Sequence, residues 1–77
     1  MKSTHKFSLE RFNDYRIGAD RNVYKLPYTD SKGNRRSLKK IKVINGRYVF
    51  FLDQRETWSR KQLAPFIIVD PNPIELK

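Results

Sequence analysis

The dipeptide Asn45-Gly46 constrains the fold of this chain more than any other feature of its sequence. It separates two segments rich in β-branched and aromatic residues, and Asn-Gly strongly favours a type I′ turn because both central positions need positive φ. We therefore predict a β-hairpin with strands in residues 35–44 and 47–52. Pairing outward from the turn sets Ile44 opposite Arg47, Val43 opposite Tyr48, Lys42 opposite Val49, Ile41 opposite Phe50 and Lys40 opposite Phe51.

The two faces of this hairpin differ in character, because side chains alternate along a strand. The face that we expect to join the core bears Ile41, Val43, Tyr48, Phe50 and Leu52. The other face is a basic ribbon with an aromatic ring in it, and it bears Lys40, Lys42, Ile44, Arg47, Val49 and Phe51. Arg35, Arg36 and Lys39 extend its charge toward the preceding loop. A two-stranded ribbon of this kind fits the major groove of duplex DNA.

The charge of the whole chain points the same way. Seventeen Lys and Arg against eight Asp and Glu give a net charge of +9, which attracts polyanions. Residues 35–61 hold nine basic and two acidic side chains, whereas residues 1–34 hold seven and four. This concentration predicts an electrostatic footprint for nucleic acid on one part of the fold.

The rest of the chain gives weaker but consistent signals. Residues 22–26 have the composition of a strand, and residues 27–34 are dense in turn formers and predict a loop. A second reversal near residues 53–54 returns the chain as a short strand over residues 55–58, which includes Trp58, a side chain that we expect in the core. Ser59 and Gln62 have the spacing of a capping box, so a helix should begin there and end early at Pro65.

These elements predict an α+β fold, a small antiparallel β-meander of three or four strands with one short C-terminal helix. We expect a single domain over residues 1–77, with flexible ends at 1–7 and 70–77, because Pro71 and Pro73 favour an extended and unpaired chain. No apolar stretch approaches the roughly 20 residues of a membrane span, and no secretory signal opens the chain. We therefore expect a cytoplasmic protein without a membrane partner.

Residues suited to catalysis are scarce. The chain has no cysteine and one histidine, His5, and its carboxylates lack the spacing of an acid–base pair or a metal site. We therefore expect no enzyme activity, no cofactor and no metal. Arg60 and Lys61 lie in the first turn of the predicted helix, where backbone amides also attract phosphate, although an ordinary exposed first turn has the same sequence.

Four stretches of the sequence follow the order of a known pattern. They are YRIGADRNVYKL at 15–26, LK at 38–39, GRYVFFL at 46–52 and RKQLAPFI at 60–67. Together they resemble the small DNA-binding module at the N-terminus of many phage HNH homing endonucleases. The resemblance implies a phage or mobile-element origin and DNA contact by the β-region. The two histidines that an HNH nuclease needs are missing, so the chain resembles the module without its nuclease.

We therefore predict a non-enzymatic, basic protein that binds nucleic acid, with duplex DNA favoured over RNA or single strands. The predicted contacts are Arg35, Arg36, Lys39, Lys40, Lys42, Arg47, Phe51, Arg60 and Lys61. One alternative is a phage accessory protein whose aromatic and basic sheet face binds a host or virion protein. Another is a single strand stacked on Phe51 and Tyr48. The ribbon could also be a solvated face kept lysine-rich against edge aggregation.

Overall fold

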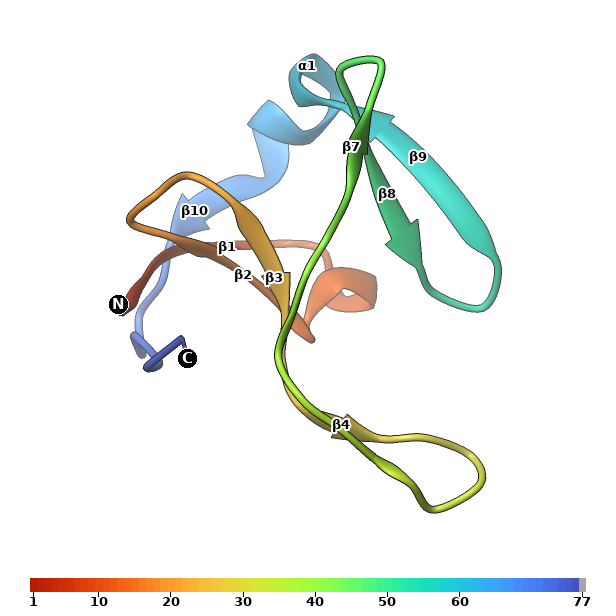
Figure 1. Cartoon of the computed structure of the whole chain (residues 1–77). Helices are drawn as coiled ribbons and strands as arrows, with labels where there is room; N and C mark the ends of the chain where they lie inside the picture. Colours follow the sequence, from red (N-terminus) through yellow and green to blue (C-terminus); the bar gives the residue numbers. More distant parts are fainter. Residues whose placement is uncertain (77) are drawn as a thin grey trace.

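The computed structural model of the chain describes residues 1–76, which form ten short strands in three antiparallel sheets and one short helix (Figure 1). The predicted α+β class, with antiparallel strands and a single short helix, is confirmed. The Cα radius of gyration is 12.2 Å, close to the roughly 11–12 Å expected of a compact chain of this length. The strands are more numerous than the three or four we expected, because the chain changes sheet several times.

The largest sheet has five strands in the order β10-β1-β2-β3-β6. Its strands are β1 (Ser3–Phe7), β2 (Tyr15–Gly18), β3 (Val23–Lys25), β6 (Lys39–Lys40) and β10 (Ile67–Val69). A 3-10 turn, η1 (Glu10–Phe12), joins β1 to β2 and carries Phe12 into the core. The predicted strand at residues 22–26 is therefore confirmed as β3, and its partner β6 comes from the segment that we expected in the hairpin.

The second sheet is built on the predicted hairpin and has the order β7-β8-β9. Its strands are β7 (Val43–Ile44), β8 (Arg47–Phe51) and β9 (Arg55–Ser59). Asn45 and Gly46 have φ of 52° and 74°, the positive values that a type I′ turn requires. Val43 pairs with Tyr48 and Ile44 with Arg47, as predicted.

From Ile41 outward the predicted hairpin register is wrong. The Val49 amide still donates to the Lys42 carbonyl at 3.0 Å, but Lys40 pairs with Tyr24 of β3. The Ile41 amide likewise donates to the Val23 carbonyl at 3.0 Å. Residues 39–41 therefore complete the edge of the five-stranded sheet, and they do not oppose residues 50–51.

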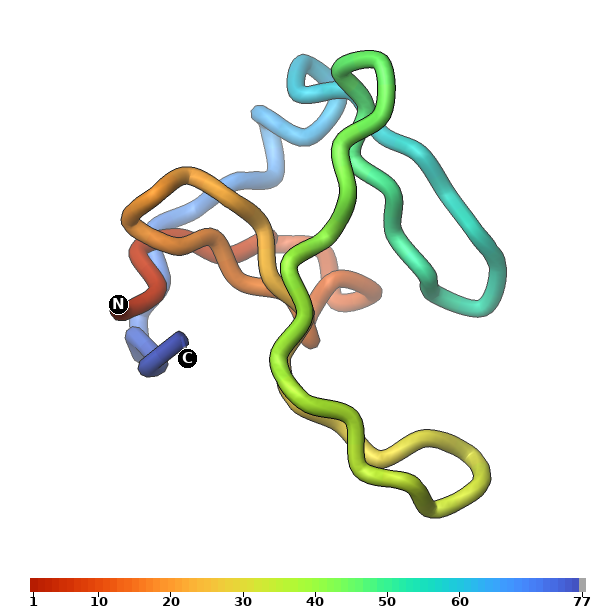
Figure 2. Tube along the Cα trace, in the orientation of Figure 1, coloured from red at the N-terminus to blue at the C-terminus, as the bar shows by residue number. Residues whose placement is uncertain are grey.

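A separate two-stranded arm replaces the loop predicted at residues 27–34. Strands β4 (Tyr28–Thr29) and β5 (Arg35–Arg36) pair with each other alone, and Figures 1 and 2 show the arm projecting from the body of the protein. The Asp30 carboxylate organises its tip by accepting from the Lys32 amide (3.0 Å), the Asn34 amide (2.9 Å) and Arg36 Nε (3.1 Å). Gly33, with φ of 83°, supplies the left-handed residue that the tip needs.

The core is an aromatic cluster between the two larger sheets. Its most buried side chains are Phe7, Phe12, Tyr15, Phe50 and Leu63. The Phe12 ring lies 4.7 Å from that of Phe50 and 5.3 Å from that of Trp58, which packs against the cluster as expected. Val43 was predicted to face the core but is 53% exposed, because it lies at the outer end of the hairpin, away from this cluster.

The predicted helix and its cap are confirmed. Ser59 Oγ accepts from the Gln62 amide and Gln62 Oε1 accepts from the Ser59 amide, at 3.2 and 2.8 Å, which begins α1 (Arg60–Leu63). A 3-10 turn containing Pro65, η2 (Ala64–Phe66), ends it and leads into β10. Within the described residues, neither α1 nor any other helix has the length and apolar character needed to cross a bilayer.

The two ends of the described chain, which we expected to be flexible, lie side by side. Strand β1 sits inside the five-stranded sheet, and the Ser3 amide donates to the Ile74 carbonyl at 2.8 Å. Buried Asp70 accepts from Ser3 Oγ at 2.7 Å and lies 3.3 Å from Arg16 Nε. The expectation of an unpaired C-terminal segment is wrong, because the residues between and after the two prolines keep backbone groups that can pair.

Candidate nucleic-acid interface

A groove with basic and aromatic walls lies where the edge of the five-stranded sheet meets β8. Its cationic side chains are Lys25, Lys39, Lys42 and Arg55, and its other walls are Tyr15, Ile41, Ile44, Val49 and Phe51. We call this the basic groove. Its cations come from three separate stretches of the chain, β3, residues 39–42 and β9, which the tertiary fold brings together.

Lys25 and Lys39 are direct partners across β3 and β6. Like charges in this position destabilise a sheet, because the side chains project from the same face. Aromatic rings compensate in part: Lys25 Nζ lies 4.1 Å from the ring centre of Tyr28, and Lys39 Nζ lies 5.9 Å from that of Phe51. Both ammonium groups are therefore held at the groove.

Phe51 is the exposed aromatic of the groove, with 55% of its surface accessible. Its backbone is fixed although its ring is free: the Phe51 carbonyl accepts from Tyr15 Oη at 3.1 Å and from Lys25 Nζ at 3.4 Å. Burial raises the pKa of the Tyr15 hydroxyl, and the hydrogen bond to Phe51 opposes this only in part, so Tyr15 remains a donor at neutral pH. The ring is thus presented to solvent from a strand end whose carbonyl is hydrogen-bonded to Tyr15 and Lys25.

The cations of the basic groove lack acidic partners. Among residues 1–76, the ion pairs of side-chain cations are Arg11 with Glu56, Arg16 with Asp70, and Arg36 with Asp30. None of these involves a side chain of the groove, although Asp14 and Asp53 line a neighbouring hollow together with Lys25. Among the described residues, the positive charge of the groove is therefore not neutralised by an ion pair.

The arm adds a second basic element. Within the described part of the chain, Arg35 makes no side-chain hydrogen bond or ion pair, whereas Arg36 is held by Asp30. The Asn-Gly hairpin, which we predicted as a DNA-binding ribbon, carries β9 as a third strand beside β8. The β4–β5 arm is consequently the free two-stranded ribbon of this fold (Figure 1).

The structure divides the nine predicted contact residues among several places. Lys39, Lys42 and Phe51 line the basic groove, and Arg35 and Arg36 lie on the arm. Lys40 projects from the opposite face of the sheet to Lys39, because neighbouring residues of a strand alternate. Arg60 and Lys61 lie on α1, where Arg60 lines a different pocket.

Arg47 is exposed, but its guanidinium group is hydrogen-bonded to neighbouring residues of the protein. Its Nε donates to Thr57 Oγ1 at 3.2 Å, and its Nη2 donates to the Thr57 carbonyl at 3.1 Å and to Gln62 Oε1 at 3.3 Å. These bonds connect β8 to β9 and to the start of α1. The guanidinium predicted to contact DNA therefore has a local structural role.

Lys25 and Arg55 belong to the basic groove but were missed at the level of sequence. Lys25 reaches the groove only because β3 pairs with β6, and no local signal fixes that pairing. Arg55 pairs with Phe51 across a turn at residues 52–54. This turn has no glycine, so the sequence does not indicate its type or the strand register that follows from it. Both omissions therefore come from pairings that sequence patterns leave open.

Residues with catalytic potential are not gathered at the groove. His5 lies half-buried in β1, with Nδ1 3.0 Å from Thr4 Oγ1. Among residues 1–76, no three His, Asp or Glu side chains cluster in a way that could hold a metal ion.

The fold and the basic groove thus define a small β-rich protein with an unpaired cationic surface around an exposed aromatic ring. Comparisons with known protein families, curated proteins and solved structures found no match for the chain. The resemblance to the DNA-binding module of HNH endonucleases stays a prediction.

Proposed function

We propose that this protein is a non-enzymatic nucleic-acid-binding protein that takes duplex DNA on the basic groove and the β4–β5 arm. The observation that carries the proposal is the pairing of Lys25 with Lys39 beside Lys42, Arg55 and an exposed Phe51, with no acidic partner among the described residues. A polyanion placed there offsets the repulsion between the two lysines. It also releases counterions, which is the main driving force of phosphate binding.

The arm favours a duplex as the partner. A two-stranded ribbon fits the major groove, which is about 12 Å wide, and the free Arg35 guanidinium can bind a phosphate or a guanine edge there. With the arm in the major groove, the basic groove faces an adjacent phosphate backbone.

A single strand is the second candidate, and the exposed Phe51 ring favours it. Bases stack on such rings next to cations in proteins that bind single strands. However, Tyr48 cannot extend this platform. It projects from the opposite face of β8 to Val49 and Phe51, and it lines a different pocket. One ring makes a shorter platform than the two we expected, which is why we favour the duplex.

A protein partner is the third candidate, favoured by the exposed apolar side chains Val43, Ile44 and Phe51 beside the groove. Affinity for such a partner would change little with salt, because a buried apolar anchor carries most of the binding energy. The proposal also includes the phage or mobile-element origin that the resemblance implies, and with it a location in the host cytoplasm or nucleoid.

Fluorescence anisotropy of a labelled random duplex and of its single strand tests the proposal. We expect duplex affinity to fall by about a thousandfold between about 50 and 200 mM salt, as for a protein that contacts roughly six phosphates. Lys39→Gln/Lys42→Gln should weaken binding, whereas the control Lys40→Gln/Lys61→Gln, with the same change in charge outside the groove, should weaken it much less. Absence of binding to either probe at low salt would reject the proposal in favour of a protein partner.

A further inference from the structure

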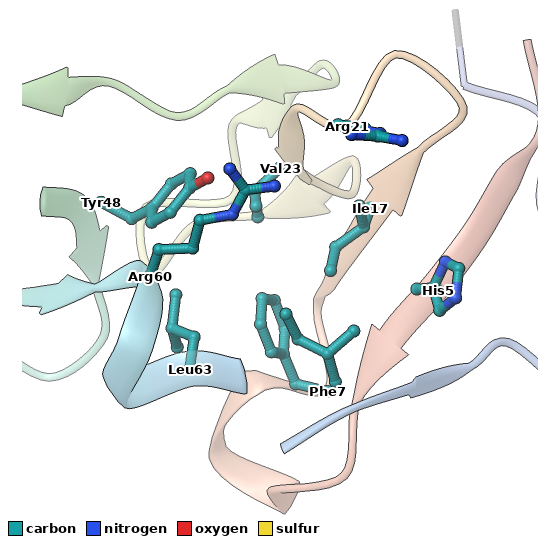
Figure 3. A pocket seen from close by; sticks show the side chains of 9 residues that line it. His5, Phe7, Ile17, Arg21, Val23, Tyr48, Arg60 and Leu63 are labelled. Atoms are coloured by element: carbon teal, nitrogen blue, oxygen red, sulfur yellow. The ribbon is translucent and has the colours of Figure 1, made fainter. Parts of the chain in front are cut away.

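A second pocket lies on the other face of β8 from the basic groove and shares no lining residue with it. Its apolar walls include Phe7, Ile17, Val23 and Leu63, and two guanidinium groups, from Arg21 and Arg60, join them (Figure 3). We call this the arginine pocket. It lies between the five-stranded sheet and α1, so elements distant in the sequence build it.

Neither arginine side chain has a polar partner among the described residues. Among residues 1–76, the side chains of Arg21 and Arg60 make no hydrogen bond and no ion pair, and no carboxylate lines the pocket. Figure 3 shows the Arg60 side chain reaching from α1 toward Tyr48 and Val23, with Arg21 beyond them in the turn that joins β2 to β3. Two unpaired guanidinium groups beside an apolar surface form a site for an anion that also has an apolar part.

The backbone of Arg21 is unusual. Its φ is 66°, in the left-handed region that Gly, Asn and Asp occupy most readily and that other residues adopt at a cost. The turn holds it there through the Arg21 amide, which donates to the Gly18 carbonyl at 2.9 Å. A long cationic side chain at a position suited to a small residue agrees with a binding role for the guanidinium.

The size of the pocket limits the ligand. Its volume of about 150 Å³ equals that of an engineered protein cavity that accommodates benzene, so one six-membered ring fits. A neutral ring would make no use of the two guanidinium groups, which are exposed beside the pocket, and a small inorganic anion would not fill its volume. We propose that the arginine pocket binds a compact aromatic anion, with its ring against the half-buried Tyr48 and Ile67 and its carboxylate or phosphate between Arg21 and Arg60.

This chemistry has two sources, a free aromatic acid and a pyrimidine nucleotide. Benzoate is the first probe, followed by changes in the amide NMR spectrum of the whole chain. We expect shifts at Val23, Tyr48 and Leu63, and affinities about tenfold weaker for acetate, which lacks the ring, and for benzyl alcohol, which lacks the charge. Uridine monophosphate that displaces benzoate and binds more tightly identifies a nucleotide, and weaker binding identifies the free acid.

Variants tie the binding to the two arginines. Arg60→Gln and Arg21→Asn should each lower the affinity for benzoate about tenfold. Asn is chosen at position 21 because it tolerates positive φ. Lys61→Gln is the matched control, because it removes the neighbouring charge of α1 outside the pocket and should leave benzoate affinity unchanged. Lys39→Gln/Lys42→Gln in the basic groove should also leave it unchanged, so this inference stands or falls separately from nucleic-acid binding.

Three results would overturn the inference. They are no spectral change at tens of millimolar benzoate, equal binding of benzyl alcohol and benzoate, and full benzoate affinity in both arginine variants. The native amide spectrum of each variant, recorded without ligand, establishes that loss of binding is not loss of the fold.

Discussion

Lys25 and Lys39 are direct cross-strand partners at the edge of the five-stranded sheet, so two side chains of like charge project from one face into the basic groove. In a sheet whose only task is to be stable, one of these positions would be better filled by a neutral or acidic side chain. The repulsion is tolerable if the ligand is an anion, and this conflict between stability and binding leads to the first prediction.

Lys39→Gln should stabilise the protein and weaken its binding of DNA. Removing one of two opposed like charges should raise the free energy of unfolding by about 0.2–1 kcal/mol, measured by urea denaturation at low salt. The control is Lys40→Gln, whose partner is Tyr24 on the opposite face, and which should change stability by less. A Lys39→Gln protein less stable than the Lys40→Gln protein would contradict the interpretation.

Phe51→Ala should separate binding from folding. Because the ring is 55% exposed, its loss should cost under about 1 kcal/mol of stability. The neighbouring Phe50 is 0% exposed, and Phe50→Ala should cost about 3–5 kcal/mol. If single strands stack on Phe51, its loss should weaken their binding by about 1–3 kcal/mol, with a smaller effect on duplex. A loss of stability in Phe51→Ala equal to that in Phe50→Ala would show that the ring belongs to the core.

Asp70 should make stability depend on pH. Burial raises the pKa of its carboxyl, but hydrogen bonds from Ser3 Oγ and the Asn72 amide, together with the charge of Arg16, outweigh this and hold the pKa below its usual value. A lowered folded-state pKa contributes stability above the unfolded pKa, about 3.9, and this contribution is lost as the pH falls through the folded value.

Asp70→Asn should therefore be less stable than the native protein at neutral pH, by about 1–3 kcal/mol, since it loses buried hydrogen bonds and an ion pair. The difference in unfolding free energy should shrink below about pH 4, as measured by urea denaturation across a pH series. Asp53→Asn, at an exposed residue, is the control for the loss of one carboxylate. A constant Asp70→Asn difference from neutral to acid pH would count against the carboxylate as the cause.

Asp30 should control the order of the arm. Hydrogen bonds from the Asn34 and Lys32 amides and from Arg36 hold the pKa of Asp30 below its usual value and fix the tip. Asp30→Ala should speed hydrogen exchange at the Lys32 and Asn34 amides and weaken duplex binding, with little change in global stability. Ser31→Ala at the same tip is the control. If the tip exchanges faster but duplex affinity is unchanged, the arm does not contribute to the interface with the duplex.

Local signals in the sequence predicted local structure well. The Asn45-Gly46 turn, the strand at residues 22–26 and the capping box at Ser59 and Gln62 are all present, because each depends on residues close together in the chain. The core position of Phe50 also followed from alternation along the predicted hairpin, and Trp58 packs against the core as expected of a single tryptophan in a short domain.

Long-range pairing explains what the sequence could not predict. Residues 39–41 could pair with β8 or with β3. The alternation of polar and apolar side chains along residues 39–41 fits both pairings, so nothing local selects β3. For the same reason the sequence does not identify Lys25 as a neighbour of Lys39, and it gives no sign that β1 lies inside a sheet. The basic groove was therefore half predicted: three of its four cations, Lys39, Lys42 and Arg55, lie in the basic stretch 35–61, but Lys25 and the geometry of the groove depend on the crossing between sheets.

The dependence of duplex affinity on salt tests the central claim most directly. For the native protein, the plot of log affinity against log salt concentration should be linear with a slope of about −5. For Lys25→Gln/Lys39→Gln/Lys42→Gln, the slope should be shallower by about 2.7, since each lost phosphate contact removes about 0.9. The matched control Lys2→Gln/Lys40→Gln/Lys61→Gln should keep a slope close to the native one. Equal slopes for the two triple variants would contradict binding of nucleic acid at the basic groove.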